Sequence, residues 1–150
     1  MDKDIILEFY KSHESSMLSH ESQRANMTNI IISLCSIIIG IVATLDSGGH
    51  KVSLSLLIPL LGLFGYLFSL KHYERFSWHL ACSNSYREKL HVMYPHSVID
   101  RNLIRKELKN RFGWVHKSRL NKYWSSIHLV IITIGIGLLV FVLLEWYSMI

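Results

Sequence analysis

Residues 52–70 read VSLSLLIPLLGLFGYLFSL and contain no Asp, Glu, Lys or Arg. Two further stretches share this character: residues 29–45 before it and residues 127–144 near the end of the chain. An α-helix of about 17–20 apolar residues spans the hydrocarbon core of a bilayer. Lipid offers the backbone no hydrogen-bond partners, so such segments are helical. The sequence therefore predicts an all-α integral membrane protein with three transmembrane helices, and its length fits a single domain.

Positive charge is concentrated between the second and third apolar segments. Residues 71–124 hold twelve of the sixteen Lys and Arg residues of the chain, against four Asp and Glu residues. Three basic residues precede the first segment, one lies in the loop 46–51, and none follows the third segment. Because cytoplasmic loops are enriched in Lys and Arg, we expect the N-terminus and residues 71–124 in the cytoplasm and the C-terminus outside.

The polar parts of the chain are also predicted to be helical. Residues 1–26 carry Ile5, Phe9 and Met17 at helical spacing, which is typical of an amphipathic N-terminal helix. No Gly or Pro occurs between residues 65 and 95, so the second span is expected to continue as a cytoplasmic helix to about residue 92. Along this continuation one packed face is expected, formed by Tyr73, Phe76, Leu80 and Leu90. The other faces are expected to be polar, through His72, Arg75, His79, Arg87 and Lys89.

A second cytoplasmic helix is predicted over residues 97–122. Ser97 and Asp100 have the spacing of a capping box, which marks a helix start. Gly113 is expected to interrupt this helix. The third span is then expected over residues 125–146, so that the cytoplasmic part forms a helical hairpin between the second and third spans.

The first apolar segment carries a line of small or polar residues. Asn29, Ser33, Ser36 and Gly40 recur at intervals of four, three and four residues and so share one helix face. We call these four residues the polar stripe. Such stripes mark close packing or hydrogen bonding between membrane helices. The alternative interpretation is the lining of a pore, in which water would solvate the hydroxyl groups.

Other residues in the spans are candidates for gating or ion contact. Pro59, Gly62 and Gly65 lie close together in the second span, where they indicate either a gating hinge or simply close helix approach. His128 lies at the start of the third span. An ionisable group in a membrane span is a candidate functional residue, but at this depth we expect its side chain to snorkel to the interface.

The basic residues between the spans form a candidate site for an anionic ligand. The densest group lies in the predicted second cytoplasmic helix and consists of Arg101, Arg105, Lys106, Lys109 and Arg111. Phosphate groups are bound by clustered cations. The same charge also fits contact with anionic lipid headgroups, so both interpretations remain open.

The sequence contains no strong catalytic or metal-binding motif. No Cys-x-x-Cys pair is present, and Cys35 and Cys82 lie in different predicted environments. Arg111 and His116 have the Arg-x4-His spacing of HEPN ribonucleases, in which these two residues act on RNA phosphates. The polar residue that usually follows the arginine is replaced by Phe112 here. We therefore expect no enzyme activity, no metal and no cofactor.

The layout as a whole resembles small bacterial membrane effectors of phage defence. A polar helix ending in SHESQRAN (19–26) leads into a membrane hairpin, and the second span flows into KHYERFSWHLACSNSYREKL (71–90). These features, with the patterns Ser22-x-Arg24-x-Asn26 and Tyr86-Arg87, are similar to SLATT-type proteins, the membrane subunit of Hailong and the accessory membrane protein of type VI-B CRISPR loci. SLATT proteins are described by two spans, so the third span departs from that pattern.

This resemblance implies a homo-oligomer in the bacterial inner membrane that depolarises or permeabilises it on infection. It also implies a nucleotide or oligonucleotide signal, membrane lipids as partners and a cytoplasmic partner from the same defence system. Our expectation is therefore a homo-oligomeric pore or ion-channel-like effector. The alternatives are a non-conducting membrane scaffold and a membrane-anchored HEPN-like ribonuclease.

Overall fold

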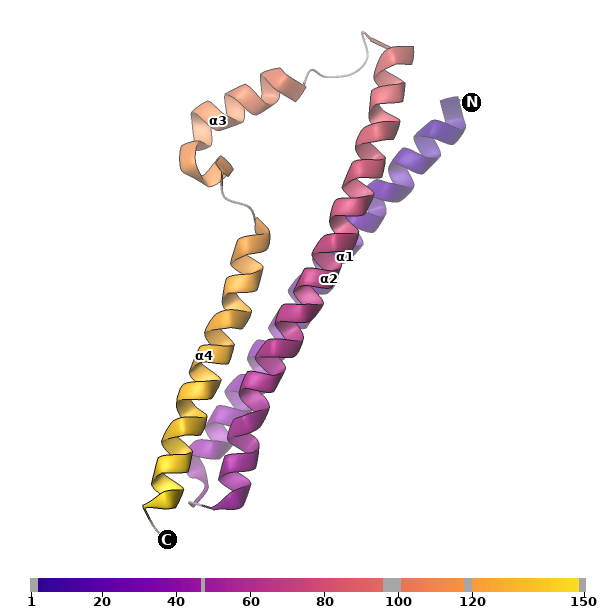
Figure 1. Cartoon of the computed structure of the whole chain (residues 1–150). Helices are drawn as coiled ribbons and strands as arrows, with labels where there is room; N and C mark the ends of the chain where they lie inside the picture. Colours follow the sequence, from indigo (N-terminus) through magenta and orange to yellow (C-terminus); the bar gives the residue numbers. More distant parts are fainter. Residues whose placement is uncertain (1–2, 47, 96–100, 118–119, 149–150) are drawn as a thin grey trace. The chain divides into compact units, whose positions relative to one another are not determined.

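The computed structural model describes residues 3–46, 48–95, 101–117 and 120–148, and the side chains of most of them. In these ranges the chain forms four α-helices and no strand (Figure 1): α1 (Lys3–Thr44), α2 (Gly49–Met93), α3 (Arg101–Lys117) and α4 (Leu120–Tyr147). Helices α1, α2 and α4 are each long and apolar enough to cross a membrane. The predicted all-α, three-span class is thereby confirmed, and the chain is a multi-pass membrane protein.

The described contacts divide the chain into two units. The apolar unit comprises residues 23–71 and 123–150, and the polar unit comprises residues 1–22 and 72–122. The apolar unit contains the second half of α1, the first half of α2 and nearly all of α4. The polar unit contains the remaining halves of α1 and α2 and the whole of α3.

The first two helices are much longer than a membrane span requires. Helix α1 has 42 residues and α2 has 45, which is more than 60 Å each at about 1.5 Å per residue. The N-terminal helix and the first span, which the sequence analysis separated at residues 26 and 29, form the single helix α1. The joining sequence contains no Gly or Pro, so nothing there stops a helix.

Helix α2 runs to Met93, close to the end at about residue 92 that the sequence predicted. It contains Pro59 without ending there. A proline inside a membrane helix is tolerated where neighbouring helices and side chains satisfy the freed backbone groups.

Small residues bring the three helices of the apolar unit close together. A Cβ atom on Gly62 would lie 2.8 Å from Cγ1 of Ile132, and one on Gly135 would lie 2.6 Å from Cδ of Pro59. The buried core of this unit is centred on Ile31, Cys35 and Ile58. With lipid outside, packing of this kind replaces the hydrophobic effect as the force that joins helices.

Most of the apolar surface of the spans remains uncovered by the chain itself. Only 17–28 % of the most apolar 18-residue window of each spanning helix is buried. Large side chains such as Ile37, Leu67 and Phe141 are more than half exposed. These surfaces suit contact with lipid tails or with further copies of the chain.

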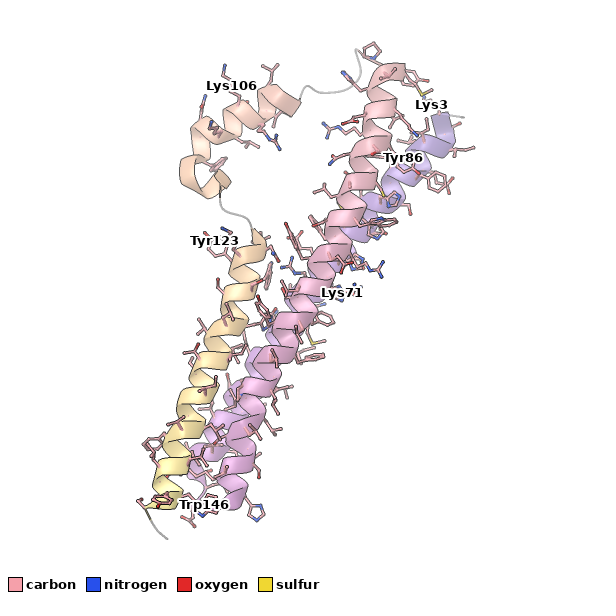
Figure 2. The ribbon with its side chains drawn as sticks, viewed as in Figure 1. Lys3, Lys71, Tyr86, Lys106, Tyr123 and Trp146 are labelled. Carbon is pink, nitrogen blue, oxygen red and sulfur yellow. The ribbon has the colours of Figure 1, made fainter. Side chains whose placement is uncertain are left out.

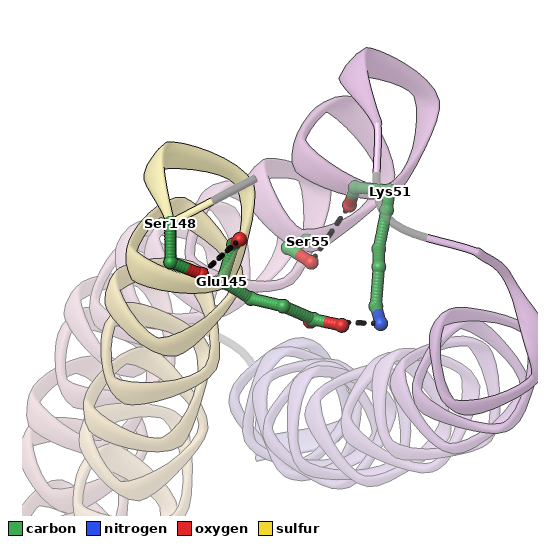
Figure 3. A network of polar contacts seen from close by, with 4 residues as sticks. All are labelled: Lys51, Ser55, Glu145 and Ser148. Carbon is green, nitrogen blue, oxygen red and sulfur yellow. Dashed lines mark hydrogen bonds and ion pairs between the residues drawn. The ribbon is translucent and has the colours of Figure 1, made fainter. Parts of the chain in front are cut away.

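An ion pair joins α2 to α4 at one end of the apolar unit. Nζ of Lys51 lies 3.0 Å from Oε2 of Glu145 (Figure 3). In the same network, Ser55 donates a hydrogen bond to the carbonyl of Lys51, and Ser148 donates one to the carbonyl of Glu145. The Lys51 side chain is 11 % exposed and that of Glu145 is 35 % exposed, so this pair is only partly screened by solvent.

Helix α3 is interrupted at Gly113, as the sequence predicted. The φ of 49° and ψ of −115° of Gly113 are not helical, and glycine alone adopts such a conformation without strain. The described part of this helix begins at Arg101. The predicted capping box at Ser97 and Asp100 lies outside the described residues.

Candidate functional site

A group of buried polar side chains joins all three helices of the apolar unit. We call it the polar cluster, and it consists of Arg24 and Thr28 on α1, Ser69 on α2 and His128 on α4. All four residues are at most 4 % exposed. Buried polar groups cost free energy unless they are hydrogen-bonded, so the contacts of these residues decide what the cluster can do.

The arginine of this cluster is held from two sides. Nε and Nη2 of Arg24 lie 3.3 and 3.2 Å from the hydroxyl oxygen of Ser69, to which both donate. The guanidinium also lies over the ring of Trp124, 5.9 Å from its centroid. An aromatic face stabilises a cation best when both are shielded from water. This arrangement fixes the positive charge of Arg24 inside the apolar unit.

Among the described residues, the histidine of the cluster has a hydrogen-bond partner at Nε2 but not at Nδ1. Thr28 donates its hydroxyl to the carbonyl of Arg24, and its oxygen lies 3.2 Å from Nε2 of His128. Because the hydroxyl proton of Thr28 is already used in that bond, the N–H group at Nε2 of His128 donates to the Thr28 oxygen. The expectation that His128 snorkels to the interface was wrong, because its ring packs between α1 and α2 at 1 % exposure.

Three buried polar atoms on neighbouring turns of α4 have no hydrogen-bond partner in the described structure. They are Nε1 of Trp124, Oγ of Ser125 and Nδ1 of His128. Unsatisfied buried polar groups are uncommon in proteins and call for an explanation such as water, an ion or a functional rearrangement. Sequence reasoning found only part of this arrangement, because it singled out His128 but not the contacts of His128 with α1 and α2.

The polar stripe faces away from the core of the apolar unit. Asn29, Ser33, Ser36 and Gly40 are all exposed, and a Cβ atom on Gly40 would meet nothing within 4 Å. The opposite face of α1 carries the buried residues Thr28, Ile31 and Cys35. Ser36 donates its hydroxyl to the carbonyl of Ile32. The stripe is therefore available to lipid, to water in an assembly, or to another copy of the chain.

The three candidate hinge residues lie at close helix contacts. Gly62 and Gly65 pack against α4, and Pro59 packs against Gly135 of the same helix. These contacts agree with the helix-approach interpretation of the sequence pattern. Their effect on gating stays a prediction.

The basic residues of α3 are exposed. Arg105, Lys106, Lys109 and Arg111 all lie on the surface, and the side chain of Lys106 points away from its helix (Figure 2). Arg105 and Lys109 are one turn apart and share a face. The side chain of Arg101 lies outside the described residues. The four described side chains are therefore open to solvent.

The spacing that resembled a nuclease motif crosses the break in α3. Gly113 interrupts the helix between Arg111 and His116, and the side chain of His116 is not among those described. Among the described residues, no group of three or more His, Cys, Asp or Glu side chains is arranged to hold a metal ion. Comparison with protein families, with curated proteins and with solved structures finds no match to this chain.

Proposed function

We propose that this protein is a homo-oligomeric pore-forming membrane effector. The observation that carries the proposal is the outward position of the polar stripe on the span of α1. The Asn29 side chain is exposed on that face, and a side-chain amide in contact with hydrocarbon costs free energy. Assembly of several copies around a water-filled path gives Asn29 and Ser33 the polar surroundings that lipid lacks.

A single copy is too thin to enclose such a path. The apolar unit contributes three helices, and most of their surface is uncovered. Self-association buries some of that surface and shields the polar stripe at the same time. The proposed orientation follows the positive-inside rule, with the N-terminus and residues 71–124 in the cytoplasm and the C-terminus outside.

The basic residues of α3 are proposed to bind the anionic signal that opens the pore. A ligand shifts a closed assembly toward an open one only when it binds the open form more tightly. The exposed cations Arg105, Lys106, Lys109 and Arg111 supply charge for a nucleotide or oligonucleotide. The proposed setting is phage defence at the bacterial inner membrane, in line with the resemblance of the sequence layout.

The pore is tested by following the membrane potential with a voltage-sensitive dye in bacteria that express the protein, with and without phage. We expect the wild type to collapse the potential and the variant Ser33→Leu/Ser36→Leu to lose most of that effect. Thr133→Leu is the matched control, because Thr133 is an exposed hydroxyl residue of α4 outside the polar stripe. An unchanged potential in cells that are nonetheless protected would exclude a pore and favour a scaffold.

The signal-binding part has a separate test. We expect Arg105→Glu/Lys109→Glu to weaken binding of a fluorescent oligonucleotide to the purified protein by at least tenfold, with a smaller dependence on salt. Lys11→Glu is the control, because Lys11 is an exposed lysine on α1 rather than α3. Equal binding by both variants would show that α3 is not the site.

A further inference from the structure

Four histidines line the contact between α1 and α2 in the polar unit. His13 and His20 are seven residues apart on α1, and His72 and His79 are seven residues apart on α2. Seven residues are close to two helical turns, so each pair lies on one face of its helix. Because α1 and α2 are consecutive and antiparallel, His13 lies opposite His79 and His20 lies opposite His72. We call these four residues the histidine ladder.

The rings of the ladder are in direct contact across the two helices. Nδ1 of His13 lies 2.9 Å from Nδ1 of His79, and Nδ1 of His20 lies 3.1 Å from Nδ1 of His72. The two pairs also meet, since the ring centroids of His20 and His79 are 5.5 Å apart. All four side chains are partly buried. The expectation that His72 and His79 lie away from the packed face of α2 was therefore wrong.

The hydrogen bond within each of these nitrogen pairs depends on the number of protons that the two rings hold. A hydrogen bond between two Nδ1 atoms needs one N–H group and one lone pair. One added proton per pair keeps the bond, because an imidazolium then donates to a neutral imidazole. A second proton places N–H groups on both atoms, so the bond is lost and two positive charges lie about 3 Å apart.

The neighbours of the ladder balance only part of the charge that four imidazolium groups would carry. Aromatic rings close one end of it: Tyr86 stacks on His13, and Trp78 lies edge-on to both His13 and His79. The charged residues that neighbour the ladder are Glu14 and Glu21 on α1 and Lys71, Glu74 and Arg75 on α2.

The surroundings of His79 disfavour its charged form. Burial, together with the charges of His13, His20 and Arg75, lowers the pKa of His79 below its ordinary value of 6.5. Protonation of His79 is therefore opposed by the structure in which it sits.

We propose that the histidine ladder is a proton-binding site that joins α1 to α2 in the polar unit at neutral pH and separates them when it fills with protons. Histidine is the side chain whose charge changes between about pH 5 and pH 8. Separation is therefore expected on acidification. The ligand of this site is the proton alone, and the site requires no metal.

One consequence rests on the proposed pore. The helices that carry the ladder, α1 and α2, continue into the apolar unit, and α1 also carries the polar stripe. Separation of their polar halves then changes the opening of the assembly. Acidification on the side of the polar unit is therefore expected to change pore conductance severalfold.

The proposal is tested by measuring distances between spin labels in the full-length protein, reconstituted in nanodiscs with EDTA. Labels are placed through Ser15→Cys and Ala81→Cys, which are exposed positions on α1 and α2, after Cys35→Ala and Cys82→Ala. We expect a narrow distance distribution at pH 7.5 and a longer, broader one at pH 5.5. A label pair in the apolar unit, at Ser53→Cys and Ser148→Cys, serves as the control and should not change.

Two results would overturn the proposal. One is an identical distance distribution at both pH values. The other is a change at pH 5.5 that persists when all four ladder histidines are replaced by glutamine. Should that variant fail to assemble, imidazole 15N shifts of the wild type decide the matter: the four rings must gain protons over the same pH interval in which the label distance grows.

The effect of the ladder on pore conductance is measured separately, so that helix separation and pore regulation can each be disproved alone. Planar-bilayer currents are recorded with the pH lowered on one side, for the wild type and for His13→Gln/His79→Gln. A pH response that the variant lacks supports regulation of the pore. Helix separation without a current response overturns only that regulation, and absence of any current at any pH overturns the pore itself.

Discussion

Gly65 of α2 lies against the imidazole ring of His128 of α4 so closely that a side chain at residue 65 has no space. A Cβ atom there would collide with Nδ1 and Cε1 of the ring and with the end of Ile31. The ring cannot move away freely, because its Nε2 is bonded to Thr28 on the other side. The glycine therefore sets the distance between α2 and α4 at the polar cluster.

Gly65→Ala is expected to destabilise the protein. Overpacking a filled interior typically costs about 1–3 kcal/mol, and here the neighbours are a bonded ring and a core isoleucine. The free energy of unfolding is measured in mixed micelles by titration with SDS. Gly137→Ala is the matched control, since a Cβ there would meet nothing within 4 Å. Equal stability of the two variants would contradict the close contact at Gly65.

The bond between Thr28 and His128 is expected to couple the two residues energetically. Hydrogen bonds between membrane helices contribute about 0.6 kcal/mol on average and about 1.7 kcal/mol at most. A double-mutant cycle of Thr28→Val and His128→Phe should give a coupling free energy of about 0.5–1.5 kcal/mol. The cycle removes the cost of each single change, so a coupling near zero would show that this bond does not stabilise the native state.

The ion pair between Lys51 and Glu145 is expected to tolerate exchange of its two charges but not reversal of one of them. Lys51→Glu alone places two acidic side chains next to each other at a partly buried site. The exchange Lys51→Glu/Glu145→Lys should recover most of the lost stability. Thermal unfolding of the three proteins at low and high salt measures this. A double variant no more stable than Lys51→Glu would show that the contact has no electrostatic role.

The sequence was sufficient to predict the spans, because the length of an apolar run is set by the bilayer and needs no tertiary information. The break at Gly113 was also predicted, because glycine readily leaves the helical conformation. The length of α2 was predicted because no Gly or Pro occurs between residues 65 and 95. The predicted N-terminal helix (1–26) and first span (29–45) lie on one continuous helix, because a change from polar to apolar residues alters the surroundings of a helix, not its backbone. Nothing in that stretch ends the helix.

The faces of the spans were harder to predict. Small and polar residues occur on both sides of α1: Ser33 and Ser36 point outward, whereas Thr28 points to His128. Composition alone does not say which side meets another helix of the same chain. The histidine ladder was missed although its seven-residue spacing on both helices was visible in the sequence. The histidines of one helix can be recognised as half of a contact only when the antiparallel helix that packs against them is known.

Stability of the polar unit is expected to decrease as the pH falls. The pKa of His79 in the folded protein lies below its ordinary value of 6.5, first because of burial and then because of His13, His20 and Arg75. The unfolded chain therefore binds this proton more tightly than the folded one, and stability is lost as the pH falls through about 6.5. Hydrogen exchange of the amides in residues 6–20, corrected for the intrinsic effect of pH, should show lower protection factors at pH 5.5 than at pH 7.5. His79→Gln should reduce this difference, whereas His50→Gln, at an exposed position in the apolar unit, should leave it unchanged. A pH dependence that is the same in all three proteins would show that His79 does not contribute to it.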